Sequence, residues 1–244
     1  MQMIKISAHR GGSEQARAAT YEAYEHALTS GAEYAEFDIR RTADGALVVY
    51  HDPRLGENGP LLSGLSYAEL CDQAGYPVPR VPDVMAMLAG RLLGHLDLKD
   101  IGYEAEVIQL ALQHFGPDGF VATTMEDVSV ATIKDKFPNV LTALSLGRDS
   151  AEIPAWKLAQ VRQSELFPMR RIRECGADWV AANYQLARRG VTERCRKNGI
   201  GVMVWTVDRD DLIDQFLADS RVNVLITNRP AFAVQRRAQF LGRD

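Results

Sequence analysis

Residues 202–227, VMVWTVDRDDLIDQFLADSRVNVLIT, contain the pattern that decides the fold. The apolar run at 202–206 is typical of a buried strand, and residues 210–218 carry apolar side chains at helical spacing. A second apolar run at 222–227 follows, so the stretch predicts a strand, a helix and a second strand. Two strands joined by a helix in this way lie parallel in one sheet.

The same alternation continues along the rest of the 244-residue chain. It predicts strands at residues 4–8, 34–40, 92–98, 119–123, 140–146 and 179–182. It predicts helices at residues 18–30, 105–115, 128–137, 165–175, 191–198 and 231–241. About eight strand–helix units in roughly 250 residues match a closed (β/α)8 TIM barrel better than an open doubly wound sheet. A Rossmann fold is disfavoured, because Gly11-Gly12 lacks the G-x-G-x-x-G spacing after the first strand.

A small insertion is predicted after the second strand. Residues 46–50 form an additional strand, because Asp44-Gly45 between two apolar runs is a strong hairpin signal. The following residues 52–66 are rich in Gly, Pro, Asn and Leu and are too many for a simple turn. We expect an insertion or lid over one end of the barrel there. No linker or change in composition interrupts residues 1–244, which we interpret as a single domain.

The composition narrows the class of protein. Hydrophobic residues make up 46% and charged residues 25%, as in soluble globular proteins, and the net charge of −4 without a block of like charges argues against nucleic-acid binding. The three cysteines form neither a CxxC pair nor a zinc pattern. Because the sequence shows no signal-peptide core and no run of roughly 18 apolar residues, we expect a cytoplasmic protein without a stable membrane anchor. Homo-oligomer formation stays open.

Polar side chains end or interrupt the early strands, where unpaired burial costs free energy. Seven of them fall within the first hundred residues, at or near the carboxyl ends of strands: His9, Arg10, Glu36, Asp38, His51, Asp97 and Lys99. Active sites of (β/α)8 barrels are built at that end of the barrel. We therefore predict that these side chains share one site.

Three carboxylates in this set predict a metal site. Glu36 and Asp38 are two residues apart on one strand, so both point into the barrel mouth, where they repel each other unless a cation lies between them. Asp97 adds a third carboxylate from the adjacent strand. Three carboxylates without a nearby cysteine favour Mg²⁺ or Ca²⁺. The alternative is a set of buried salt bridges from these carboxylates to the nearby cations Arg40, Arg41 and Lys99.

Two histidines accompany the carboxylates. His9 and His51 follow strand ends, and imidazole suits proton transfer near neutral pH, so we predict a general acid and a general base. Arg10 and Lys99 add fixed positive charge that suits an anionic phosphoryl group. For His95, within the 92–98 strand, we expect an outward-facing or purely structural role.

The ordered motifs resemble the glycerophosphodiester phosphodiesterase family, in the PLC-like phosphodiesterase superfamily. The resemblance rests on His9-Arg10-Gly11 and on residues 31–39 (GAEYAEFDI), 42–52 (TADGALVVYHD), 81–85 (VPDVM), 96–99 (LDLK), 204–208 (VWTVD) and 226–230 (ITNRP). It spans essentially the whole chain. Any one motif is weak alone, and the ordered set is specific.

This resemblance implies a (β/α)8 barrel that hydrolyses a glycerophosphodiester to glycerol 3-phosphate and an alcohol with a divalent metal. It places Glu36, Asp38 and Asp97 on the metal. The remaining roles that it implies are acid and base for His9 and His51, phosphate binding for Arg10 and Lys99, and contact with the glycerol for Trp205. The alternative for Trp205 is an aromatic core residue.

Three departures from the family pattern indicate a divergent member. The usual Pro-Glu-Asn-Thr segment is reduced to Thr20 after Ala18-Ala19, Asp97 replaces a glutamate, and Asn228 replaces an aspartate. The substrate could therefore be a related sugar or lysophospholipid phosphodiester. The alternative function is a catalytically weakened homologue that binds phosphodiesters as a sensor or accessory protein. A metal-dependent aldolase or isomerase is a more distant alternative, because one fold hosts many chemistries.

Overall fold

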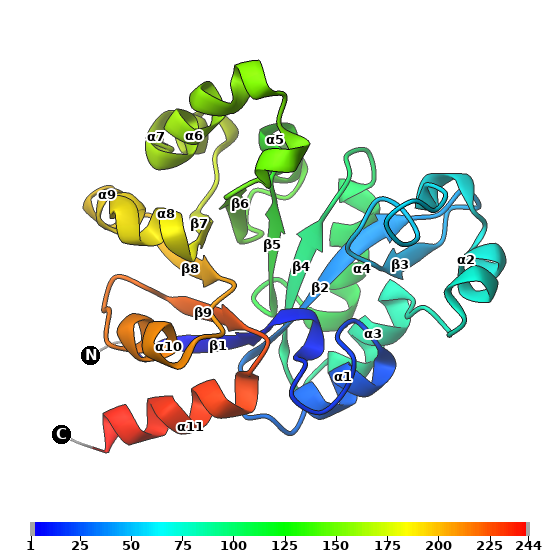
Figure 1. Cartoon of the computed structure of the whole chain (residues 1–244), viewed down its shortest axis with the longest axis horizontal. Coiled ribbons are helices and arrows are strands. Elements are labelled where there is room, and N and C mark those ends of the chain that lie inside the picture. The colour runs from blue at the N-terminus through cyan, green and yellow to red at the C-terminus, as the bar shows by residue number, and fades with distance from the viewer. Residues whose placement is uncertain (1–2, 243–244) are drawn as a thin grey trace.

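Eight parallel strands close into a barrel among residues 3–242, the part of the chain that the computed structural model describes. They are β1 (Lys5–Ala8), β2 (Tyr34–Arg41), β4 (Leu93–Leu98), β5 (Phe120–Thr124), β6 (Thr142–Leu146), β7 (Trp179–Asn183), β8 (Gly201–Trp205) and β9 (Val224–Thr227). Their order is β1-β9-β8-β7-β6-β5-β4-β2, and the pairing of β1 with β2 closes the ring. The predicted (β/α)8 TIM barrel is confirmed (Figure 1). Residues 1–2 and 243–244, which the single-domain prediction includes, lie outside the described residues.

Helices connect the barrel strands, and most of them cover the outer surface of the barrel (Figure 1). They are α1 (Tyr21–Ala27), α2 (Tyr67–Ala74), α3 (Val81–Leu88), α4 (Glu104–Phe115), α5 (Asp127–Lys136), α6 (Leu158–Leu166), α7 (Met169–Cys175), α8 (Tyr184–Leu186), α9 (Thr192–Lys197), α10 (Asp210–Leu217) and α11 (Pro230–Leu241). The single helix predicted at 165–175 is wrong, because the chain breaks into α6 and α7 at Phe167-Pro168. Proline lacks the N–H that a continuous helix requires and disfavours helical geometry in the residue before it.

The predicted hairpin and insertion follow β2. Strand β3 (Leu47–Val49) pairs antiparallel with β2, with Ile39 opposite Val49. Within residues 52–66, Arg54 forms an isolated bridge with Leu61, and the 3-10 turn η2 (Leu62–Gly64) follows. The insertion is therefore present, and its role as a lid stays a prediction.

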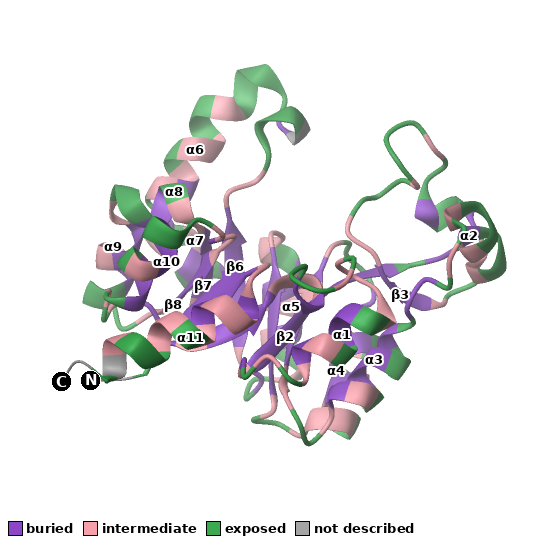
Figure 2. Ribbon diagram, turned by 60° about the horizontal axis from the view of Figure 1, so that its bottom comes forward, coloured by how far each residue is buried: buried purple, intermediate pink, exposed green. Residues whose placement is uncertain are grey.

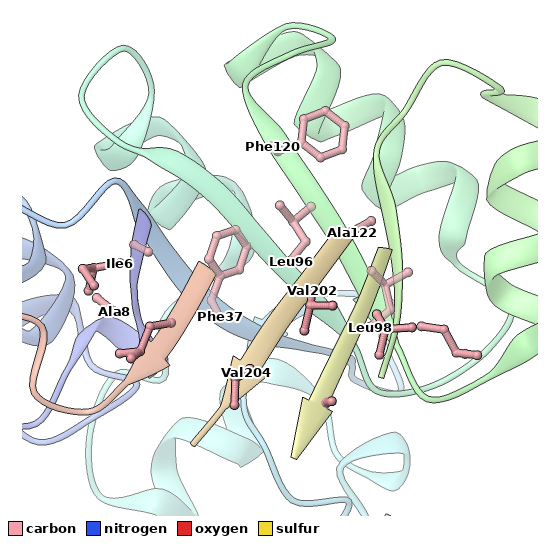
Figure 3. Close-up of a cluster of buried hydrophobic side chains, with 14 of the residues drawn as sticks. Ile6, Ala8, Phe37, Leu96, Leu98, Phe120, Ala122, Val202 and Val204 are labelled. Carbon is pink, nitrogen blue, oxygen red and sulfur yellow. The ribbon is translucent and has the colours of Figure 1, made fainter. Parts of the chain in front are cut away.

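Two apolar cores hold the barrel together. The larger core lies between the strands and the helices and includes Ile6, Phe37 and Leu96 (Figure 3). The smaller core fills the barrel interior with side chains such as Val121 and Met203. Figure 2 shows that many of the buried residues lie in the strands. Because strand side chains alternate between faces, most barrel strands contribute to both cores.

Polar side chains replace the inner apolar core toward the carboxyl ends of the strands. Tyr34 of β2 belongs to the inner core, whereas the inward positions that follow it are Glu36 and Asp38. On β5 the same change occurs from Val121 to Thr123. In the part of the chain that the structure describes, no helix combines the length and apolar character needed to cross a bilayer.

Candidate active site

The register of β2 against β4 brings the three predicted carboxylates together. Asp38 lies opposite Asp97, and Glu36 lies opposite His95. One oxygen from each of Glu36, Asp38 and Asp97 lies within 4.8 Å of the others. Glu36 and Asp38 are only 3% and 1% exposed. Such a buried, all-oxygen donor set is the kind that Mg²⁺ and Ca²⁺ prefer.

Two cationic side chains contact the carboxylates. Nζ of Lys99 lies 2.8 Å from Oδ1 of Asp38 and also contacts Asp97. Nε of Arg10 lies 2.8 Å from Oδ2 of Asp38. A phosphoryl group bound next to the carboxylates would therefore meet the positive charges of Arg10 and Lys99.

The salt-bridge alternative holds for only one of its three cations. Lys99 pairs with Asp38, whereas Arg40 pairs with Asp100 at 2.7 Å and Arg41 with Glu106 at 3.6 Å. Both arginines are therefore engaged outside the carboxylate cluster.

The electrostatics of the cluster fit an additional cation. Burial, with further contributions from Asp38 and Asp97, raises the pKa of Glu36 well above its usual value. Burial would also raise the pKa of Asp38, but Lys99 and Arg10 outweigh it and hold that pKa below its usual value. Neither carboxylate oxygen of Asp38 forms a hydrogen bond of good geometry within the described residues. When Glu36 is ionised, three carboxylates face two cations, and a divalent ion would stabilise that buried negative charge.

A strained turn at the end of β1 shapes one wall of the site. The turn η1 (His9–Gly11) places Arg10 at φ +52°, a region that non-glycine residues rarely adopt. The backbone N–H of Arg10 donates to Oε2 of Glu36 at 2.7 Å. A Cβ on Gly11 would lie 2.8 Å from the carbonyl carbon of Ala23, so α1 approaches the turn too closely for a side chain. Ala19, at the departure from the family pattern, donates its N–H to the carbonyl of Arg10 and has φ +59°.

His9 is held in one orientation beside the carboxylates. Its Nδ1 lies 2.8 Å from Oδ1 of Asn228, and its Nε2 lies 4.0 Å from Oε2 of Glu36. The amide oxygen can only accept, so Nδ1 carries the proton and Nε2 has the free lone pair. Burial, followed by the charge of Arg10, lowers the pKa of His9 to about 4. His9 is therefore a neutral proton acceptor at pH 7.

Asn228 is oriented by Asp208, a residue that the sequence analysis did not single out. Oδ2 of Asp208 accepts from Nδ2 of Asn228 at 2.7 Å, and Oδ1 accepts from its backbone N–H at 2.8 Å. An aspartate at position 228 would face the carboxylate of Asp208, which accounts for the asparagine there. The motif at 204–208 contains Asp208, but sequence spacing gives no sign of a contact 20 residues away.

His51 lies across the site from His9, at the end of the β3 hairpin. Nδ1 of His51 donates to Oδ1 of Asp52 at 2.7 Å, and its side chain is 42% exposed. His9 is thus half-buried beside Glu36, whereas His51 has a more exposed side chain beside Asp52.

A buried hydrogen-bond chain runs beneath the carboxylates. His95 faces the barrel interior, so the expectation that it faces outward is wrong and the structural alternative applies. Its Nδ1 lies 3.0 Å from Oγ of Ser7, and its Nε2 lies 3.2 Å from Oγ1 of Thr123. Thr123 in turn donates to Oδ1 of Asp97 at 2.7 Å. These hydrogen bonds hold the carboxylate of Asp97, the shorter side chain that replaces the family's glutamate.

All eight predicted site residues line one pocket of about 110 Å³. They are His9, Arg10, Glu36, Asp38, His51, Asp97, Lys99 and Trp205. Trp205 is half-buried, packs against the inner core and lines the pocket, and its indole N–H donates to the carbonyl of Ala181 at 2.9 Å. A larger cleft of about 640 Å³ adjoins the pocket and shares its outer residues.

This fold and this pocket define the class of the protein, a phosphoric diester hydrolase on a (β/α)8 barrel. Residues 9–232 match the model of the Glycerophosphoryl diester phosphodiesterase family. The chain belongs to that family, as its motifs led us to expect.

Known members of the family are similar to this chain over most of its length and most of their own. A glycerophosphodiester phosphodiesterase of Caldanaerobacter subterraneus is 23% identical over 92% of this chain and 94% of its own. The crystal structure of a glycerophosphodiester phosphodiesterase from Agrobacterium tumefaciens is 26% identical, with a TM-score of 0.72 over 95% of this chain and 100% of that one. An Oleispira antarctica phosphodiesterase in complex with sn-glycerol-3-phosphate is 17% identical, with a TM-score of 0.75 over 96% of each chain.

Proposed function

We propose that this protein hydrolyses a glycerophosphodiester to glycerol 3-phosphate and an alcohol, using a divalent metal held by Glu36, Asp38 and Asp97. The observation that carries the proposal is the convergence of three carboxylates and two imidazoles, from four strands, on one small pocket. The product complex of the Oleispira phosphodiesterase supports the same chemistry. A bound Mg²⁺ or Ca²⁺ would supply Lewis-acid polarisation of a phosphoryl oxygen.

The protein side chains divide the remaining work. Arg10 and Lys99 bind the phosphoryl oxygens and offset the charge that builds up in the transition state. His9, neutral and with a free Nε2, takes the proton of the attacking hydroxyl as general base. His51, which Asp52 holds through a hydrogen bond to Nδ1, gives a proton to the leaving alcohol.

The test is hydrolysis of glycerophosphoethanolamine by the full chain with Mg²⁺, Ca²⁺ or Mn²⁺, with and without a chelator. We expect glycerol 3-phosphate to form only with metal. His9→Ala and His51→Ala are each expected to lower kcat by roughly 10²- to 10⁴-fold, the usual contribution of a general acid or base. His26→Ala, on the outer helix α1, is the matched control and should keep the wild-type rate.

Two results would contradict the proposal. Wild-type rates in either active-site variant would remove the assigned proton transfers. Binding of the diester without turnover under every metal condition would favour the alternative, a sensor or accessory protein.

A further inference from the structure

The cleft that adjoins the catalytic pocket has a wall of arginines. The cleft shares His51, Lys99 and Trp205 with the pocket, so a group bound at the carboxylates continues directly into it. Its far side comes from the segments that follow β6 and β7. We call three lining residues on that side the arginine wall: Arg148, Arg162 and Arg189.

The first part of the wall adjoins the catalytic pocket. Gly147 has so little room that a Cβ there would lie 3.3 Å from the indole of Trp205. Arg148, the next residue, therefore begins the wall immediately beyond Trp205. The pocket at the carboxylates is small, so the second alcohol of a bound diester must extend toward this wall.

Two of the arginines are braced from behind by carboxylates. Glu165 of α6 is 2% exposed, pairs with Nη1 of Arg162 at 2.7 Å and accepts the backbone N–H groups of Gly147 and Arg148. Nη2 of Arg148 donates to Oε1 of Glu126 at 2.6 Å. A guanidinium has five N–H donors, so the contact with Glu165 fixes Arg162 and still leaves donors for a ligand. Such bracing lowers the entropy lost on binding.

Arg189 supplies the wall's unneutralised charge. It lies in the irregular turn Ala187–Val191, where Arg189 and Gly190 depart from helical backbone geometry. Among the side chains that the structure describes, no carboxylate forms an ion pair with Arg189, and its side chain is exposed at the cleft. Three of the four acidic lining residues contact a basic side chain: Asp52 contacts His51, Asp97 contacts Lys99, and Glu126 contacts Arg148. The fourth, Asp149, accepts the backbone N–H of Ala151 within its own turn.

We propose that the cleft selects diesters whose leaving alcohol carries an anionic group, a carboxylate or a second phosphate. The inference rests on the proposed function, because it concerns the other half of the same substrate. An arginine guanidinium can donate two parallel, charge-assisted hydrogen bonds to two oxygens of either group. Tyr184 and Gln185, on the same wall, offer hydrogen bonds to an alcohol's hydroxyls. A cationic headgroup meets like charge there, and an acyl chain meets a polar surface.

The test compares substrates that differ in one charged group. Glycerophosphoserine and glycerophosphoethanolamine share an ammonium and differ by one carboxylate, and a third ester carries a phosphate on its alcohol. With the full chain and Mg²⁺, we expect kcat/KM for at least one anionic ester to exceed that for the ethanolamine ester by roughly tenfold or more, the usual effect of a hydrogen bond to a charged group. The larger gain identifies carboxylate or phosphate.

Variants at two neighbouring arginines test whether the arginine wall causes this preference for anionic esters. Arg189→Ala should lower that preference about tenfold, and Arg189→Glu should reverse it, because attraction becomes repulsion. Arg188→Ala, an exposed arginine outside the cleft lining, is the matched control and should keep the wild-type preference.

The outcomes separate the two proposals. If all esters are hydrolysed with equal efficiency, or if both Arg189 variants keep the wild-type preference, this inference is wrong and the proposed function stands. If no ester is hydrolysed with any metal, the proposed function is wrong and this inference falls with it.

Discussion

The tautomer of His9 depends on two side chains on the Nδ1 side of its ring. Asp208 accepts one hydrogen bond from the side-chain amide of Asn228 and one from its backbone N–H, and the amide oxygen faces Nδ1 of His9. The proton is thereby kept on Nδ1, so Nε2 stays available as an acceptor. Partners of this kind set which imidazole nitrogen reacts.

Asn228→Leu tests this orientation. The variant keeps the approximate volume and removes the acceptor, so Nδ1 no longer has a fixed partner. We expect kcat to fall roughly 10- to 100-fold, the usual cost of losing such a supporting group, with a smaller change in KM. Steady-state kinetics measure the split. Asn198→Leu, which removes a surface asparagine that bonds only to the carbonyl of Arg194, is the control. An unchanged kcat in Asn228→Leu would show that His9 needs no such partner.

Single residues divide into those that the sequence predicts and those that it does not. Strand alternation was enough to direct Glu36 and Asp38 inward, because a fixed period of two sets which face each side chain takes. The same rule places His95 inward, two residues before Asp97, so our outward expectation for His95 did not follow the strand period. The contact between Asp208 and Asn228 joins two loops, and no periodic rule predicts where loop side chains meet.

Among the larger elements, the segment that follows β6 is held between helix and barrel. Gly147 has φ +119°, and a Cβ there would lie 2.5 Å from Cβ of Asn183. The side chain of Glu165 in α6 accepts hydrogen bonds from two backbone N–H groups of the same segment. The wall of the cleft therefore depends on close packing between α6, β7 and β8.

Gly147→Ala is expected to destabilise the protein more than Gly199→Ala. Both glycines have positive φ, so both variants carry backbone strain, but a Cβ at Gly199 meets nothing within 4 Å. The overlap at Gly147 should add about 1–3 kcal/mol to the loss of unfolding free energy, as overpacking usually does. Urea denaturation of both variants measures the difference. Equal losses would mean that the segment relaxes without cost.

Elements were predicted best where apolar periodicity was strong and unbroken. All eight barrel strands were predicted because buried parallel strands read as short apolar runs. The helix at 165–175 was predicted as one piece because its apolar spacing continues through Pro168, whose missing N–H divides it. Helix α2 follows a loop-rich stretch and packs in a small separate cluster rather than on the barrel. Its periodicity is therefore too short to stand out.

Across the whole molecule, the barrel has one apolar end and one charged end. The inner core at the first end stabilises the fold, whereas the carboxylates at the other end oppose it. Buried Glu36 has a raised pKa, so its charge costs free energy in the metal-free protein. Sites of function are expected to carry this kind of conflict between stability and chemistry.

Glu36→Gln should abolish the gain in stability that metal brings and should not weaken the metal-free protein. For the wild type, a metal at 100 times its Kd adds about 2.7 kcal/mol, which raises Tm by roughly 5–10 °C for a chain of this size. The variant lacks one ligand oxygen and is expected to gain little. Calorimetry with chelator and with Mg²⁺ measures both. A wild type whose Tm does not respond to any divalent ion would contradict the metal site.

The pH dependence of the metal-free proteins gives a second measurement with a control of opposite sign. Because the pKa of Glu36 is raised by folding, the wild type should lose stability relative to Glu36→Gln as pH rises above the unfolded value of about 4.3. At Glu104, burial is outweighed by hydrogen bonds, above all that from Ser129 at 2.6 Å, so its pKa is lowered. The wild type should therefore lose stability relative to Glu104→Gln as pH falls through that lowered pKa. Parallel profiles for the two variants would show that the barrel mouth imposes no special cost on Glu36.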